Sequence, residues 1–252
     1  APGDAVVVLP AEGIYALARY SDGSVPFYVL PGDDGAAPGD EGAAFIEELG
    51  RDAARLWVVV DTQASQGAGL QAWLAPRFYR ASDAWFGPLQ LLLYAPPGAE
   101  GTGVDLLPGG ATWQNGVNLR EARALDDELS LGHILRLDLA WQASEPITQP
   151  AKVFLHLVAV DGSLAAQRDA EPVDGTRPLT SWLPGEVIAD RAGLWLPADL
   201  VAGDYRLLLG LYDAGLHPGQ RVPVGGGEAD SIPLARIRVQ GDAARILTLV
   251  EN

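Results

Sequence analysis

The sequence contains no cysteine and no methionine. Without cysteine the chain can form no disulfide, and it can hold neither a thiolate nucleophile nor a cysteine-ligated zinc or iron–sulfur site. The cellular compartment stays open, because exported and cytosolic domains can both lack cysteine. A natural translation product begins with methionine, so its absence predicts that the chain is a fragment cut or processed from a longer polypeptide.

Basic residues and long apolar runs are also scarce. Only 17 lysines and arginines stand against 33 acidic residues, which gives a formal net charge of −16. This balance argues against nucleic acid as a partner, because a polyanion is bound by a basic surface. No apolar run approaches the roughly 18–20 residues of a membrane span, and no signal-peptide pattern is present. We therefore expect the fragment itself to be soluble, with any membrane span outside it.

The first hundred residues alternate between strand-like and helix-like segments. Apolar runs at 5–9, 25–30, 56–60 and 89–94 predict strands, and helices are expected at 11–20, from residue 40 onward and around residues 70–78. Such alternation is typical of βαβ units with a parallel sheet. The sequence therefore predicts a small α/β, Rossmann-like three-layer domain over residues 1–97.

Beyond a linker rich in proline and glycine at 96–103, the spacing of apolar residues changes from that of a helix to the every-second-residue alternation of a strand. Leu135, Leu137, Leu139 and Trp141 alternate with more polar residues, and similar strands are expected at 153–158, 205–212 and 232–239. Turn signals such as Asp161-Gly162 separate them. This pattern predicts an all-β sandwich, jelly-roll or immunoglobulin-like, over residues 98–252.

The α/β half offers one candidate pair for chemistry and no nucleotide-binding motif. Neither a GxGxxG sequence nor a P-loop is present. Glu12 and Asp61 follow predicted strands at the edge where α/β sheets bind ligands, so they could bind a cation or act as acid and base. The simpler interpretation is that Asp61 caps a helix or turn.

Polar residues in the β half allow two interpretations. His156 shares a strand face with Phe154 and Val158, where a histidine is usually a hydrogen-bonded structural residue. We expect it to belong to a structural polar network with Gln167, Asp169, Asp190 and Arg191. Asp161, Asp169, Asp174 and Asp190 could instead bind calcium. Their spacing matches no calcium loop, so solvated turn aspartates are favoured and no cofactor is expected.

Sugar binding is the third possibility for the β half. Trp182 precedes Pro184-Gly185 in a polar turn and is the best candidate for stacking on a sugar, with Asp169 and Gln167 as partners for hydroxyl groups. Trp141 and Trp195 belong to strand patterns and are expected in the core. The predicted binding residues are therefore Trp182, Asp169, Gln167, Asp61 and Glu12, and no catalytic residue is assigned.

A run of motifs in the β half carries a resemblance to a known family. It consists of WQASEPITQP at 141–150, VFLHLVAVDG at 153–162, QRD at 167–169, PVDG at 172–175, TSWLPGEVIAD at 180–190, LPADLVAGDYRL at 196–207 and GLYD at 210–213. Together they resemble the extracytoplasmic C-terminal β-sandwich domain of bacterial membrane glycosyltransferases similar to protein mannosyltransferases, of the Chloroflexi type. The α/β half is similar to the soluble segment that follows the last membrane span of these proteins. One departure is Leu131-Gly132-His133, where the family pattern has Pro-Gly-Asp.

The resemblance implies a non-catalytic, extracytoplasmic accessory module of a membrane-tethered glycosyltransferase. Its partners would be the membrane-spanning portion of the parent protein and a glycan or acceptor. The catalytic carboxylate of that enzyme class lies in a loop of the membrane region, which this sequence lacks, so no catalytic residue is carried over. Two alternatives stay open: a free-standing hydrolase with its site between the two domains, and a purely structural interaction domain.

Overall fold

The computed structural model describes residues 3–9, 13, 19, 22–30, 37–63, 67–98, 103–107 and 109–249. The chain divides into two compact units, Ala1–Ala99 and Glu100–Asn252. The predicted linker at 96–103 contains this division. None of the described helices is long and apolar enough to cross a membrane.

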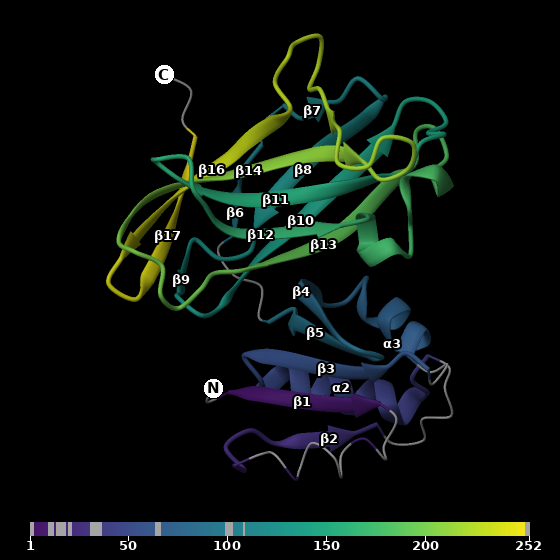
Figure 1. Ribbon diagram of the computed structural model, residues 1–252, viewed down its shortest axis with the longest axis vertical. Helices are drawn as coiled ribbons and strands as arrows, with labels where there is room; N and C mark the ends of the chain where they lie inside the picture. The colour runs from purple at the N-terminus through teal and green to yellow at the C-terminus, as the bar shows by residue number, and fades with distance from the viewer. Residues whose placement is uncertain are drawn as a thin grey trace. The chain divides into compact units, whose positions relative to one another are not determined.

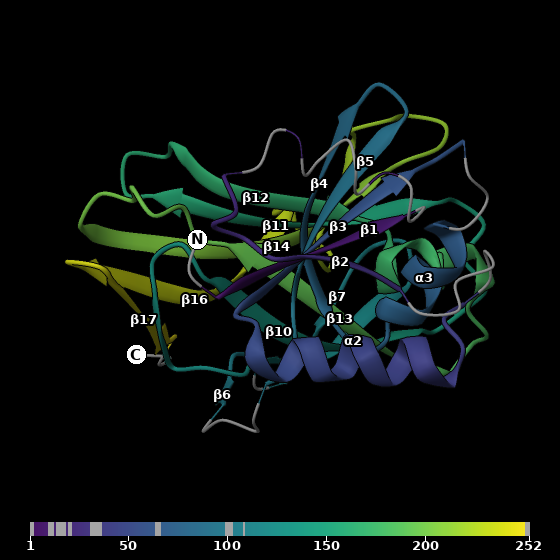
Figure 2. The ribbon, with the colours of Figure 1, turned by 90° about the horizontal axis from the view of Figure 1, so that it is seen from below.

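The first unit is built on a mixed sheet with the strand order β2-β1-β3-β5-β4. β1 pairs in parallel with β2 and β3, whereas β5 pairs antiparallel with both β3 and β4. Figure 2 shows the two described helices beside these strands. The elements are β1 (Asp4–Leu9), β2 (Phe27–Val29), α2 (Asp40–Asp52), β3 (Arg55–Asp61), α3 (Gly67–Leu74), β4 (Tyr79–Phe86) and β5 (Leu89–Ala95).

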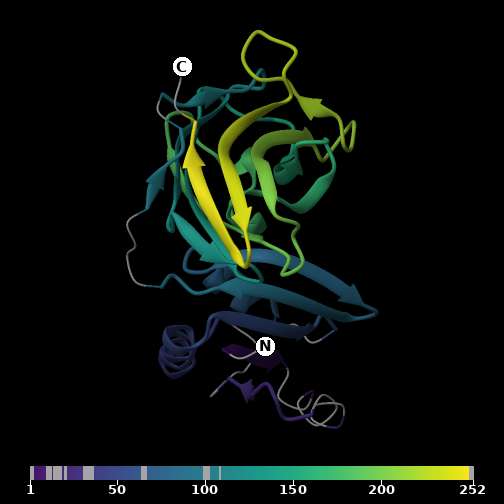
Figure 3. The same cartoon turned by 90° about the vertical axis from the view of Figure 1, so that its left-hand side faces the viewer.

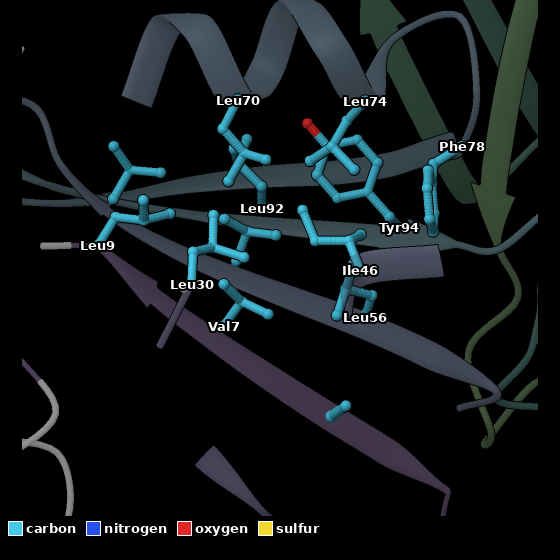
Figure 4. Close-up of a cluster of buried hydrophobic side chains, with 13 residues drawn as sticks. Val7, Leu9, Leu30, Ile46, Leu56, Leu70, Leu74, Phe78, Leu92 and Tyr94 are labelled. Atoms are coloured by element: carbon cyan, nitrogen blue, oxygen red, sulfur yellow. The ribbon is translucent and has the colours of Figure 1, made fainter. Parts of the chain in front are cut away.

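Both described helices contribute to one core cluster on the sheet. α2 inserts Ile46, and α3 inserts Leu70 and Leu74, against apolar side chains of β1, β3 and β5 (Figure 4). Leu56 of β3 and Leu74 of α3 are fully buried. Burial of each such side chain stabilises the fold by about 1.5–3 kcal/mol.

The predicted Rossmann-like three-layer domain is wrong. Its sheet would be parallel throughout, but β4 and β5 form an antiparallel hairpin with only Gly87 and Pro88 between them. The strand β4 was not predicted because its face pattern is irregular, with Tyr79 and Ala81 buried and Trp85 and Phe86 exposed. The predicted helix at 11–20 lies largely outside the described residues.

The regular structure of the second unit is almost entirely strand, arranged in two antiparallel arrays (Figure 1). The order β13-β10-β8-β6, with β7 also on β8, forms one array. The order β12-β11-β14-β16-β17-β9, with β15 also on β14, forms a second, curled sheet (Figure 3). The elements are β6 (Val104–Asp105), β7 (Ala111–Thr112), β8 (Val117–Ala124), β9 (Glu128–Ser130), β10 (Ile134–Ala143), β11 (Ala151–Ala159), β12 (Leu164–Ala170), the 3-10 helices η1 (Pro172–Gly175) and η2 (Leu179–Ser181), β13 (Val187–Trp195), β14 (Gly203–Asp213), β15 (Arg221–Val222), β16 (Ser231–Gln240) and β17 (Ala243–Thr248).

The predicted jelly-roll or immunoglobulin-like sandwich is likewise wrong as a fold class. An immunoglobulin-like domain divides seven strands into four and three, and a jelly roll contains eight strands in two Greek keys. Here the curled sheet alone runs through six strands in the order β12-β11-β14-β16-β17-β9. Local alternation correctly predicted that the region is rich in strands, but it could not predict the order in which the strands pair.

The curled sheet has one apolar face and one mixed face. Val153, Leu155 and Leu157 of β11 are buried on the inner face. Because side chains alternate along a strand, Phe154 and His156 lie on the opposite face. We call this opposite side of β12-β11-β14-β16-β17-β9 the outer face.

Candidate functional site

The β11–β12 hairpin brings together three residues of the predicted polar network. In the antiparallel register, His156 lies opposite Gln167 and Phe154 lies opposite Asp169. The Nε2 atom of His156 is 3.6 Å from Oδ1 of Asp169, with the two side chains 16% and 34% exposed. The rings of His156 and Phe154 have centroids 4.6 Å apart. The Asp161-Gly162 turn therefore places one imidazole, one amide and one carboxylate side by side.

β14 and β15 extend this cluster across the outer face. Tyr212 lies opposite Arg221 in the register. The guanidinium carbon of Arg221 is 3.9 Å from the centroid of the Phe154 ring, a cation–π contact. Burial raises the pKa of the Tyr212 phenol above its ordinary value, and the nearby Asp169 carboxylate adds to this effect. Tyr212 is therefore a neutral hydroxyl that can donate or accept a hydrogen bond.

Gly210 makes the close packing of this cluster possible. It lies opposite Phe154 on β14. A Cβ atom at this position would collide with the Phe154 ring and lie 2.6 Å from the carbonyl oxygen of Asp230. The absence of a side chain therefore lets the ring, only 1% exposed in total, lie against the strand and support both His156 and Arg221.

We call the group His156, Gln167, Asp169, Tyr212 and Arg221, with Phe154 beneath it, the His156 site. It combines a carboxylate, an amide, a phenol and a guanidinium on four neighbouring strands. Within the described part of the chain, the side chains of Gln167 and Tyr212 make no hydrogen bond. The site therefore offers both donors and acceptors to a polar ligand.

Trp182 does not belong to this surface, so its predicted stacking role is wrong. Its side chain is buried, at 3% exposure, just after η2. Its indole Nε1 donates a hydrogen bond to the backbone oxygen of Arg177 at 2.9 Å. The polar sequence around Trp182 suggested exposure, but the turn packs the ring inward.

Asp190 and Arg191 are also separate from His156, which corrects the predicted network. Both lie on β13, whose neighbour is β10 of the other array. The guanidinium of Arg191 is 3.9 Å from the carboxylate of Asp138 on β10. The alternation of apolar and polar residues predicts a strand here, but it does not predict the sheet to which that strand belongs.

Asp190 instead joins a buried cluster that the sequence did not predict. Its carboxylate accepts hydrogen bonds from the backbone N–H of Val173 at 2.9 Å and from Nε1 of Trp141 at 3.3 Å. Arg168 of β12 donates to Asp174 at 2.7 Å, with both side chains nearly fully buried. Burial raises the pKa of Asp190; Arg168 opposes this shift and Asp174 adds to it.

The backbone beside this cluster is strained. Val173 and Asp174 adopt left-handed conformations with φ of 50° and 53°, which cost free energy for residues other than glycine. The hydrogen bond from Val173 to Asp190 and the ion pair of Asp174 hold η1 in this conformation. The cluster is therefore a structural connection between β12, η1 and β13.

The remaining predicted residues have separate positions. Oδ1 of Asp61 accepts a hydrogen bond from the backbone N–H of Gln63 at 3.0 Å, so Asp61 caps a turn. Glu12 lies outside the described residues. The four proposed calcium ligands do not converge: Asp161 lies in a hairpin turn, Asp169 on the outer face, and Asp174 and Asp190 in the buried cluster. Across the described ranges, no three acidic or histidine side chains are grouped to hold a metal ion.

A pocket of about 660 Å³ lies at the end of the β11–β12 hairpin, where residues 159–165 face the loop 197–204. Polar groups that line it are hydrogen-bonded to other groups of the protein. The pKa of Asp161 is lowered by hydrogen bonds from the side chain and backbone of Ser163. The Tyr205 hydroxyl donates to the carbonyl oxygen of Val201 at 2.7 Å. The His156 site has more polar groups available and is the stronger candidate.

Comparison with known proteins does not show a family. No family model matches the chain, and no curated protein matches it at a significant level. The chain is similar to a solved structure described as the crystal structure of the C-terminal domain of wzt, with 16% sequence identity and a TM-score of 0.34. The match covers 58% of this chain and 81% of that chain. At this distance the likeness carries no argument about the site, and the resemblance to membrane glycosyltransferases stays a prediction.

Proposed function

We propose that the second unit is a non-catalytic glycan-binding module and that the His156 site holds the sugar. The observation that carries this proposal is the set of donors and acceptors on adjacent strands, with Phe154 and Gly210 fixing their positions from below. Sugars are recognised through many hydroxyl groups, each of which can donate and accept. Donor and acceptor side chains that are held in place on paired strands can meet that requirement with little rearrangement of the protein.

Four side chains of the site, Asp169, Gln167, Tyr212 and Arg221, have distinct parts in the proposed binding. The Asp169 carboxylate accepts from two neighbouring hydroxyls, and the Gln167 amide donates to one oxygen and accepts from another. Tyr212 and Arg221 contact the opposite side of the same sugar. Hydrogen bonds to charged groups are worth about 1.5–3 kcal/mol when well formed. Because Asp169 is partly exposed, we expect its removal to cost the lower end of that range.

We further propose that this module belongs to a membrane glycosyltransferase, is extracytoplasmic and is tethered by the membrane-spanning portion of the parent protein. The motif run over residues 141–213 supports this context. The sequence encoded upstream of residue 1 tests it. Several membrane spans would support the proposal, and a signal peptide alone would contradict it.

Glycan binding is tested with the full chain on an array of neutral and acidic bacterial cell-envelope oligosaccharides, followed by calorimetry on the hits. Asp169→Asn should weaken binding about tenfold, which corresponds to 1.4 kcal/mol. Asp83→Asn, on the exposed part of β4, is the matched control and should have no effect. Binding to no glycan on the array would overturn the proposal. If the chain instead turns over glycosides or esters, and Asp61→Asn or Asp169→Asn abolishes that turnover, the protein is a hydrolase.

A further inference from the structure

Four exposed arginines lie on three adjacent strands of the outer face, next to the His156 site. They are Arg206 of β14, Arg236 and Arg238 of β16, and Arg245 of β17, and we call them the arginine patch. In the register, Arg206 lies directly opposite Arg236 and Arg238 lies directly opposite Arg245. Like charges in directly opposed positions of a sheet are destabilising. The fold therefore tolerates two unfavourable pairs at this place.

Acidic residues of the protein compensate the patch only in part. Oδ2 of Asp204 is 3.1 Å from Arg236, and Oδ1 is 2.8 Å from Arg238. Hydrogen bonds from Arg238 lower the pKa of Asp204, so this carboxylate is ionised. Among the residues that the structure describes, Arg206 and Arg245 make no ion pair.

The charge balance of the outer face differs from that of the chain. The whole sequence has 33 acidic and 17 basic residues. The curled sheet nevertheless carries the four arginines of the patch, together with Arg221 and the only lysine, Lys152, which lies opposite Tyr212. On the same strands the outer face has the acids Asp169, Asp204 and Glu128, the last of which lies opposite Arg245. Asp230, just before β16, lies 3.8 Å from Arg221, so six basic side chains still face four acids. A basic surface on so acidic a protein needs a physical reason.

We infer that the ligand of this face is an acidic glycan, with its carboxylate or phosphate groups bound by the arginine patch. This inference rests on the proposed function, because the sugar hydroxyls are assigned to the His156 site. The two groups are contiguous: His156 lies opposite Leu208, and Arg206 is two residues away on the same face of β14. Such diagonal neighbours are about 7–8 Å apart, so a short oligosaccharide can reach both.

The chemistry of arginine fits this ligand class. The planar guanidinium presents paired donors that match the two oxygens of a carboxylate or phosphate. An anion placed between Arg206 and Arg236 would remove their mutual repulsion. Binding would therefore be stronger for a charged sugar than for the same sugar with its charge blocked.

The test compares matched ligands and matched variants of the full chain. Calorimetry uses acidic oligosaccharides bound on the array and their counterparts with methyl-esterified carboxylates or with phosphate removed. Binding of the acidic form should be at least about tenfold tighter. The double substitution Arg206→Gln with Arg236→Gln should remove that preference. Arg120→Gln is the control, because Arg120 is exposed on β8 of the other array and bonded to Gln142. The melting temperature of each variant, measured alongside, separates lost affinity from lost folding.

The outcomes distinguish two claims: that this face binds a glycan, and that the glycan is acidic. A preference for the acidic form that Arg206→Gln and Arg236→Gln abolish, and that falls as salt shortens the screening length, supports the inference. Equal binding of charged and blocked sugars overturns the inference and leaves glycan binding standing. Binding to phosphatidylglycerol vesicles, with no binding to any glycan, overturns both and makes the patch a lipid-binding surface.

Discussion

Substitution of Gly210 by alanine should disturb the His156 site from beneath. The new methyl group would overlap the Phe154 ring and approach the carbonyl oxygen of Asp230. Atoms in ordinary contact are about 3.5–4.0 Å apart, so the ring must leave its place over β14. Overpacking of this kind costs about 1–3 kcal/mol. In a chain of this size each kcal/mol lost lowers the melting temperature by roughly 2–4 °C, so the expected drop is about 2–12 °C.

The displaced ring should also weaken ligand binding, because Phe154 supports both Arg221 and His156. Thermal unfolding followed by tryptophan fluorescence measures the stability change, and calorimetry with a bound glycan measures the affinity. Gly226→Ala is the matched control, since a Cβ atom at Gly226 meets nothing within 4 Å and its backbone is not in the left-handed region. We expect that control to change the melting temperature very little.

A double-mutant cycle tests the stated cause. If the Phe154 ring is responsible, Gly210→Ala should cost less stability in a Phe154→Leu background, with a coupling of about 0.5–3 kcal/mol. Two results would refute the reasoning. One is a wild-type melting temperature for Gly210→Ala, and the other is an equal loss in both backgrounds.

Three further substitutions separate structural from binding roles. Burial raises the folded-state pKa of Asp190, so wild-type stability should fall as pH rises from the unfolded-state pKa of about 3.9 through that raised value. Asp190→Asn should flatten this pH dependence, measured by urea unfolding at a series of pH values. An unchanged slope would contradict the role given to Asp190. Trp182→Phe should lose about 1 kcal/mol with its hydrogen bond to Arg177, and a loss of glycan affinity without a loss of stability would return Trp182 to the binding surface. His156→Ala should lower the melting temperature more than it lowers affinity, whereas Asp169→Asn should do the reverse; the opposite ranking would make His156 the ligand contact.

Local sequence signals predicted the parts of the site that lie within one hairpin. The Asp161-Gly162 turn between two apolar runs is confirmed as the connection of β11 and β12. That turn fixes the register, and the register places His156 opposite Gln167. The grouping of these residues with Asp169 therefore followed from neighbours within about twenty positions of one another.

The pairing of strands that lie far apart in the sequence could not be predicted from local patterns. Tyr212 and Arg221 reach the site because β14 pairs with β11 across more than fifty positions, and no local pattern encodes that choice. Alternation with the buried Leu211 could have placed Tyr212 on the outer face. No such signal could have predicted that Asp190 lies apart from His156. Alternation with a period of two residues shows which face of a strand a side chain lies on, but not which strand pairs with it.

The first unit shows the same limit. Alternating elements predicted a parallel sheet, and β1, β2 and β3 are indeed parallel. The strand β4 was missed because its end exposes Trp85 and Phe86 instead of polar residues. Its hairpin with β5 turned the expected parallel arrangement into a mixed sheet.

The central claim is that the outer face of the curled sheet binds an acidic glycan, and chemical-shift mapping by NMR tests it most directly. The full 15N-labelled chain is titrated with an acidic oligosaccharide selected on the array. The account predicts shifts in the amides of β11, β12, β14 and β16 around His156, Asp169 and Arg206, and none of comparable size on β8 or β10. Shifts confined to the other array, or to the first unit, would contradict it.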